Sequence, residues 1–113
     1  MEPETARSRL LAEQQRLEQT RTAARDLVGV PTEEAATPAA TGVPGAEPFE
    51  RERDTRVLQR VEAELGEIDA ALARLDAGSY GVCELCARPI GDARLEAMPA
   101  ARYCVDDQAR AER

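Results

Sequence analysis

The strongest pattern in the chain is a heptad repeat of apolar residues in its second half. Six apolar positions advance by 3, 4, 3, 4 and 3 residues: Leu58, Val61, Leu65, Ile68, Leu72 and Leu75. Spacing of this kind places one apolar seam along a helix that pairs with a second helix. Pro48 suits the first position of such a helix, and Gly78 suits its carboxyl end. The pattern predicts a helix over residues 49–77.

A second helix is predicted near the start of the chain, over residues 5–28. This segment contains good helix formers and neither Pro nor Gly, and Gly29 and Pro31 follow it directly. Its apolar positions repeat at seven residues and continue to its end: Leu10, Leu17, Ala24, Leu27 and Val28. The two segments are of similar length. An antiparallel coiled coil within one chain is therefore preferred to a homodimeric zipper or an ordinary helical hairpin.

Residues 29–48 separate the two predicted helices and have a different composition. Pro, Thr, Ala and Gly dominate, and Glu33, Glu34 and Glu47 are the charged residues. No apolar period continues through this segment, so we expect a loop at the tip of the hairpin, with one helical turn around 32–36. The fold class is mainly α.

Composition narrows the possible functions. The net charge of -7 argues against non-specific binding to nucleic acid, which depends on basic surfaces. The absence of His excludes imidazole metal ligands and Ser-His-Asp catalysis, so we expect no enzyme activity. The first nine residues are charged and no apolar run follows them, so we expect a cytoplasmic protein without a membrane segment.

Three cysteines and one aspartate in the last third have the spacing of a zinc site. Cys83 and Cys86 form a C-x2-C pair, and a gap of 17 residues leads to Cys104 and Asp107 in a C-x2-D pair. Two such pairs at this separation are typical of structural zinc, and a carboxylate oxygen can replace a thiolate. The replacement is expected to weaken zinc binding. Metal-free packing of the cysteines and a redox pair at C-x2-C remain as alternatives.

The segment from Leu72 to Cys104 resembles the zinc-finger region of the DksA/TraR family. The marks are Gly-x-Tyr-Gly-x-Cys-x2-Cys, then Pro-Ile-Gly, then Arg-Leu-Glu-Ala-x-Pro before the third cysteine. Members are bacterial transcription regulators that insert a coiled-coil tip into the secondary channel of RNA polymerase and do not read DNA sequence. Some act together with guanosine tetraphosphate. The resemblance implies zinc bound by four residues: Cys83, Cys86, Cys104 and, in the fourth position, Asp107.

Two departures from the family pattern affect what is expected. The fourth cysteine is absent, and nothing in residues 29–48 matches the acidic Asp-x-x-Asp-x-Ala tip of the best-known members. We therefore expect a polymerase-binding regulator, with a non-catalytic scaffold of the same fold as the alternative. A DNA-binding finger is less favoured, since residues 79–113 hold five Arg against six acidic residues. The expected organisation is a helical hairpin over 1–78 and a zinc-finger module with a short final helix over 79–113.

Overall fold

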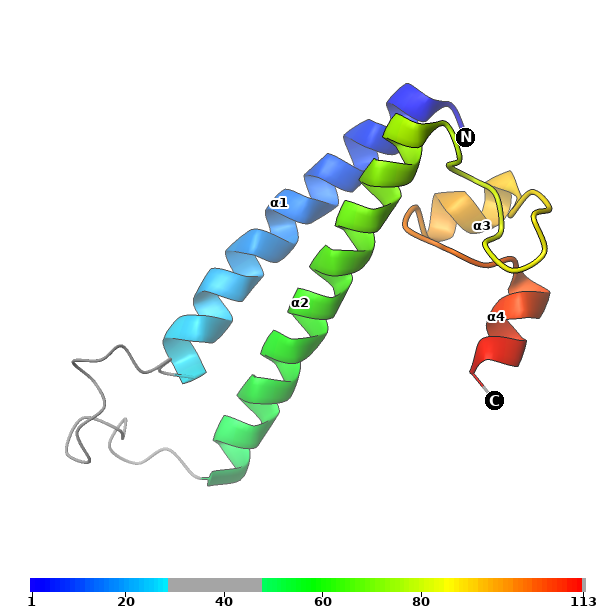
Figure 1. The fold of residues 1–113 in the computed structure, drawn as a ribbon. Coiled ribbons are helices and arrows are strands. Elements are labelled where there is room, and N and C mark those ends of the chain that lie inside the picture. Colours follow the sequence, from blue (N-terminus) through cyan, green and yellow to red (C-terminus); the bar gives the residue numbers. More distant parts are fainter. Residues whose placement is uncertain (29–47, 113) are drawn as a thin grey trace. The chain divides into compact units, whose positions relative to one another are not determined.

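A computed structural model describes residues 1–28 and 48–112, which form four helices (Figure 1). The two long ones are α1, Pro3–Val28, and α2, Pro48–Ala77. The two short ones are α3, Asp92–Ala97, and α4, Val105–Ala111. Within the described ranges there is no strand, only an isolated bridge between Val82 and Pro89. The predicted long helices and the mainly α class are confirmed, whereas α3 was not predicted.

Local chemistry explains where the long helices begin and end. Each begins at a proline, whose fixed φ suits the first turn and whose missing N–H would have no partner there. At the end of α2, Gly78 has a φ of 76°, and the N–H of Ser79 bonds the Arg74 carbonyl at 2.9 Å. The N–H of Gly78 also bonds the Leu75 carbonyl at 3.2 Å. This pair of bonds is a Schellman motif, which confirms the predicted glycine cap.

The first of two compact units comprises residues 1–15 and 65–113. Here the start of α1 runs antiparallel to the end of α2, with Arg7 paired to Asp76 at 2.7 Å and Gln14 to Asp69 at 3.0 Å. Apolar side chains between these two helix segments are buried: Ala6, Leu10, Leu65, Ile68 and Ala71. Two alanines among them leave room for the helix backbones to approach closely.

The second compact unit comprises residues 16–64. Leu17, Ala24 and Val61 are buried in it, and Arg25 pairs with Glu62 at 3.1 Å. The predicted apolar stripe extends too far, because Leu27 is 65% exposed. Leu27 lies near the end of α1, beyond Ala24, the last buried residue among the described side chains of this helix. The expected turn at 32–36 and the side chains of Glu33 and Glu34 lie outside the described residues.

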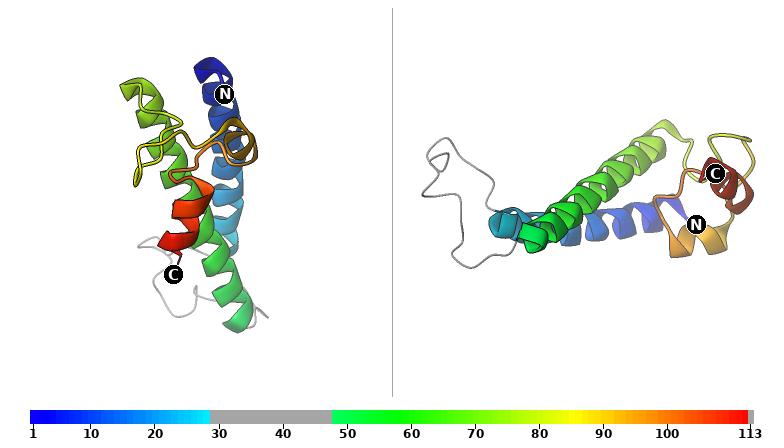
Figure 2. Two further views of the ribbon diagram at one scale, coloured as in Figure 1. Left: turned by 90° about the vertical axis from the view of Figure 1, so that its right-hand side faces the viewer. Right: turned by 90° about the horizontal axis from the view of Figure 1, so that it is seen from below.

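The finger that follows α2 has a small apolar core. Figures 1 and 2 show α3 and α4 as separate short helices joined by an irregular segment. Four buried residues form the core, with both tyrosines packed against it: Cys83, Ile90, Leu95 and Ala101. The Tyr80 hydroxyl donates to the Pro99 carbonyl at 2.8 Å, and burial raises the pKa of this phenol. The division at residue 78 between hairpin and finger stays a prediction.

Charged side chains join the finger to α2. The Arg74 guanidinium, on a side chain only 11% exposed, donates to the carbonyls of Ala100 and Ala101 at 3.3 Å each. It also lies 3.5 Å from Glu84. Arg102 lies between Glu84, at 3.4 Å, and Glu67 of α2, at 2.5 Å. The segment with the first cysteine pair is thereby held against the end of the long helix.

Candidate metal centre

The first cysteine pair lies in a tight turn directly after the Val82 bridge. The Cys83 N–H donates to the Arg88 carbonyl at 2.8 Å, and the Ala87 N–H donates back to the Cys83 carbonyl at 2.9 Å. To close this turn, Ala87 takes a φ of 61°, a left-handed conformation that glycine adopts more easily. An alanine at this position is therefore less favourable than a glycine would be.

The second pair lies at the start of α4. Cys104 is the residue before the helix, and Asp107 lies in its first turn, three positions later. Residues at this spacing share one side of a helical turn, so both side chains point the same way. Asp107 is buried, with 6% exposure, whereas its neighbour Asp106 is exposed. The helix thus selects the carboxylate that was expected from the C-x2-D spacing.

The structure brings all four predicted side chains together. The three sulfurs and one carboxylate oxygen lie within 4.8 Å of one another. Cys86 Sγ is 3.9 Å from Cys104 Sγ, and Asp107 Oδ2 is 3.1 Å from Cys83 Sγ and 3.3 Å from Cys104 Sγ. Tetrahedral zinc with bonds of about 2.3 Å to sulfur and 2.1 Å to oxygen would separate two sulfurs by about 3.8 Å and a sulfur from an oxygen by about 3.6 Å. The donor set and its spacing fit a zinc ion.

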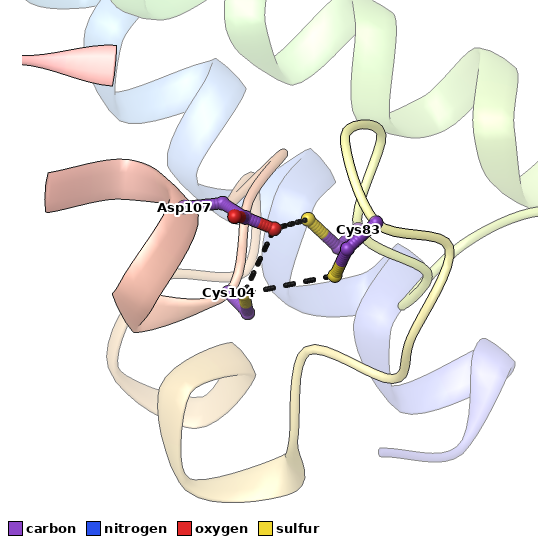
Figure 3. Close-up of side chains that lie close together, drawn as sticks. Cys83, Cys104 and Asp107 are labelled. Carbon is purple, nitrogen blue, oxygen red and sulfur yellow. Dashed lines mark hydrogen bonds between the residues drawn. The ribbon is translucent and has the colours of Figure 1, made fainter. Parts of the chain in front are cut away.

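Figure 3 shows how the carboxylate is oriented in this cluster. Both dashed lines from Asp107 end on the same oxygen, and the other oxygen points away from the sulfurs. Cys83 comes from the segment after α2, and Asp107 comes from α4 (Figure 3). The ligand candidates therefore converge from two ends of the finger.

The side chains of the cluster shift one another's pKa values. Hydrogen bonds from the thiols of Cys86, Cys83 and Cys104 lower the pKa of Asp107 to about 2. The Asp107 carboxylate in turn raises the pKa of Cys86 to about 12. Burial opposes ionisation of Cys83, but hydrogen bonds from backbone N–H groups outweigh it and lower that pKa. Without a metal, the ionised Asp107 carboxylate accepts hydrogen bonds from the thiols. A metal ion that binds here would displace the thiol protons, because thiols ligate as thiolates.

The surroundings weigh against the alternatives to a metal site. Cys83 is buried and Cys104 half-buried, but Cys86 is exposed, unlike a cysteine that fills an apolar core. All three are free thiols, and the parts of the chain that the structure describes contain no thioredoxin-like strands.

One face of the cluster opens on a cavity of about 460 Å³, whose lining includes Arg88 and Arg110.

Arg110 was missed by reasoning from the sequence. Its Nη1 lies 3.7 Å from Asp107 Oδ1, three residues earlier on α4. The spacing alone could have suggested an ion pair on a helix, but nothing in the sequence separates this arginine from others on exposed helix faces.

Two long helices, followed by a finger that brings three cysteines and one aspartate together, define a class of helical zinc-finger proteins. The model of the prokaryotic dksA/traR C4-type zinc finger matches residues 78–113. The structure of transcription factor DksA2 from Pseudomonas aeruginosa is similar, with a TM-score of 0.72 and 31% sequence identity. That match covers 97% of this chain and 82% of the other. The chain belongs to the DksA/TraR zinc-finger family, and zinc is the metal of its finger.

Curated relatives match a shorter region. The RNA polymerase-binding transcription factor DksA of Caulobacter vibrioides is 45% identical over 64 residues, which is 57% of this chain and 45% of that protein. The factor of the same name from Haemophilus influenzae is 36% identical over 62 residues, covering 55% of this chain and 38% of that protein. The matched region thus spans less than half the length of these relatives.

Proposed function

We propose that this protein binds bacterial RNA polymerase and regulates transcription, with residues 29–48 at the tip of the hairpin entering the secondary channel. The observation that carries the proposal is the similarity to transcription factor DksA2 over 97% of the chain. The names of the curated relatives as RNA polymerase-binding factors support it. The protein would act in the cytoplasm, without catalysis of its own. Among the described helices, none is long and apolar enough to cross a membrane.

We also propose that Cys83, Cys86, Cys104 and Asp107 are the zinc ligands and that the metal is structural. The spacing of their donor atoms supports this assignment. Native mass spectrometry with and without a chelator tests it on the wild type and on Asp107→Ala. We expect one zinc per wild-type chain, lost at a lower chelator concentration from the variant. Equal retention by both proteins would remove Asp107 from the ligand set.

Binding and transcription assays test the polymerase proposal. We expect the purified protein to form a complex with RNA polymerase and to change transcription from a sensitive promoter. Replacing residues 32–47 by a Gly/Ser linker of the same length should abolish the change in transcription while leaving the two long helices and the zinc content unaltered. A chain that neither binds polymerase nor alters transcription at any concentration would contradict the proposal.

A second candidate is a non-catalytic scaffold of the same fold. It is favoured by one observation, the absence of the acidic tip pattern from residues 29–48. The same assays separate the two candidates, because a scaffold would leave transcription unchanged with either tip. We assign no guanosine tetraphosphate site and no sequence-specific contact with DNA.

A further inference from the structure

Asp107 is the buried charged residue of the described chain, and its two oxygens have different surroundings. Oδ2 faces two cysteine sulfurs, at 3.1 Å and 3.3 Å. Oδ1 faces the guanidinium of Arg110, at 3.7 Å. A buried carboxylate needs partners that compensate its charge, and here each oxygen has different partners.

A cation beside Oδ1 matters because of how carboxylates bind metals. A carboxylate can offer one oxygen or both, whereas structural zinc prefers four donors in a tetrahedron. Three cysteines already supply three donors in this cluster. An arginine that holds Oδ1 leaves only Oδ2 for the metal. Partners of this kind, one shell beyond the ligands, orient the ligand and affect metal affinity.

We propose that Arg110 is a positioning residue that holds Asp107 as a ligand through Oδ2 alone, and so adapts a four-thiolate finger to a carboxylate. The inference rests on the proposed ligation by Asp107. It predicts that zinc affinity depends on Arg110, which would not be so in a finger with cysteine at position 107. A thiolate has a single donor atom and presents no second atom for an arginine to bind. The contribution of Arg110 to zinc affinity should therefore exist only when residue 107 is an aspartate.

The competing explanation is an ordinary surface ion pair on a helix. Arg110 has a side chain that is 76% exposed, and pairs of this spacing on helix surfaces contribute little to stability. A general electrostatic effect is a further alternative, since any cation near the cluster attenuates its negative charge. The surface pair predicts almost no effect of Arg110 on zinc affinity, and the general electrostatic effect predicts the same change whether residue 107 carries oxygen or sulfur.

A double-mutant cycle on the full chain separates these explanations. Zinc affinity is measured by competition with a chromophoric chelator for four proteins: wild type, Arg110→Ala, Asp107→Cys and the double variant. Loss of an outer partner commonly weakens metal binding about 10–100-fold, and the exposure of Arg110 reduces our expectation to about 3–10-fold in the wild type. In the Asp107→Cys background we expect less than a twofold effect.

Arg88 supplies a matched control, because it lines the same cavity and no ion pair to Asp107 is found for it in the described part of the chain. Arg88→Ala should change zinc affinity equally in the aspartate and cysteine backgrounds. If Arg110→Ala also acts equally in both, or has no effect in either, the positioning role is refuted. If Asp107→Ala leaves zinc affinity unchanged, the ligand assignment itself fails, which is a different result.

Cobalt substitution gives a second readout that does not depend on affinity. The visible d–d spectrum of Co²⁺ reports the number and geometry of its ligands. We expect Arg110→Ala to alter the spectrum of the cobalt-loaded protein, because Oδ1 is released toward the metal. An unchanged spectrum in Arg110→Ala, together with a clear change in Asp107→Cys, would overturn the proposal. Circular dichroism of each variant establishes that the helices are retained.

Discussion

Replacing Arg74 with alanine should destabilise the protein far more than replacing an arginine that makes a shorter but exposed ion pair. Arg74 is almost entirely covered, with 11% of its side chain exposed, and contacts the finger at three points. Alanine would remove the two bonds to the carbonyls of Ala100 and Ala101 and also the ion pair with Glu84, at 3.5 Å.

The magnitude follows from those contacts. A hydrogen bond from a charged group contributes roughly 1.5–3 kcal/mol, and bonds as long as these fall at or below the lower end of that range. The carbonyl of the buried Ala101 would also lose its partner, and the aliphatic stem would leave a void. We expect Arg74→Ala to lower the free energy of unfolding by about 2–4 kcal/mol, and Arg74→Lys to lower it by about half as much.

Urea unfolding of the zinc-loaded protein, followed by circular dichroism, measures this difference. Arg7→Ala is the control: Arg7 pairs with Asp76 at 2.7 Å, but the two side chains are 44% and 70% exposed. Solvent screening limits such a pair to about 0–1 kcal/mol. If the two alanine variants unfold at the same urea concentration, burial does not govern these arginines and the reasoning is refuted.

Four further substitutions test other parts of the structure by the same urea assay. Ala87→Gly should stabilise the zinc-loaded protein by up to about 1 kcal/mol, because glycine adopts a φ of 61° without strain; a loss of stability would contradict this. Tyr80→Phe should cost about 0.5–1.5 kcal/mol at neutral pH. Because the folded pKa is raised, this phenol stabilises the fold fully below its ordinary pKa of 10.0 and progressively less as pH rises through the raised value. The variant should therefore lose less stability in alkali than the wild type, and an identical alkaline decline would refute the assignment. Leu10, which is 1% exposed, should lose about 2–5 kcal/mol of unfolding free energy when replaced by alanine. Leu11→Ala is the control and should lose under about 1 kcal/mol, because Leu11 is 47% exposed. Equal losses would contradict the burial of Leu10 between the helices.

The long helices were predictable because the signals for them are local. Heptad spacing, a proline at the start and a glycine at the end determine α2 within one residue of its observed limits. The error at Leu27 has a tertiary cause, since periodicity continues past the point where a partner helix covers the residue. The four candidate ligands were also predictable, because metal spacing is a short-range pattern.

The finger beyond its ligands was harder to predict. Helix α3 is too short for periodicity to reveal, although Gly91 and Pro99 bound it in the sequence. The burial of Arg74 depends on the docking of residues 26 and 27 positions away, which no local pattern encodes. Arg110 acquires significance only once the direction of the Asp107 oxygens is known. Orientation and docking are thus the properties that required the structure.

Because the core of the finger is small, we expect the stability of this module to vary with the supply of zinc. Four buried residues, one of them a cysteine of the metal cluster, form a small apolar interior, and a bound metal would add to the stability of so small a core. With the proposed ligands, a bound ion would link positions 83 and 107 as a reversible cross-link, and its contribution would rise with the logarithm of free zinc. Each tenfold fall in free zinc would remove about 1.4 kcal/mol from the folded finger once the site is near saturation. The folded fraction of this module would therefore follow the zinc status of the cell, while the described parts of the two long helices contribute no side chain to the metal cluster.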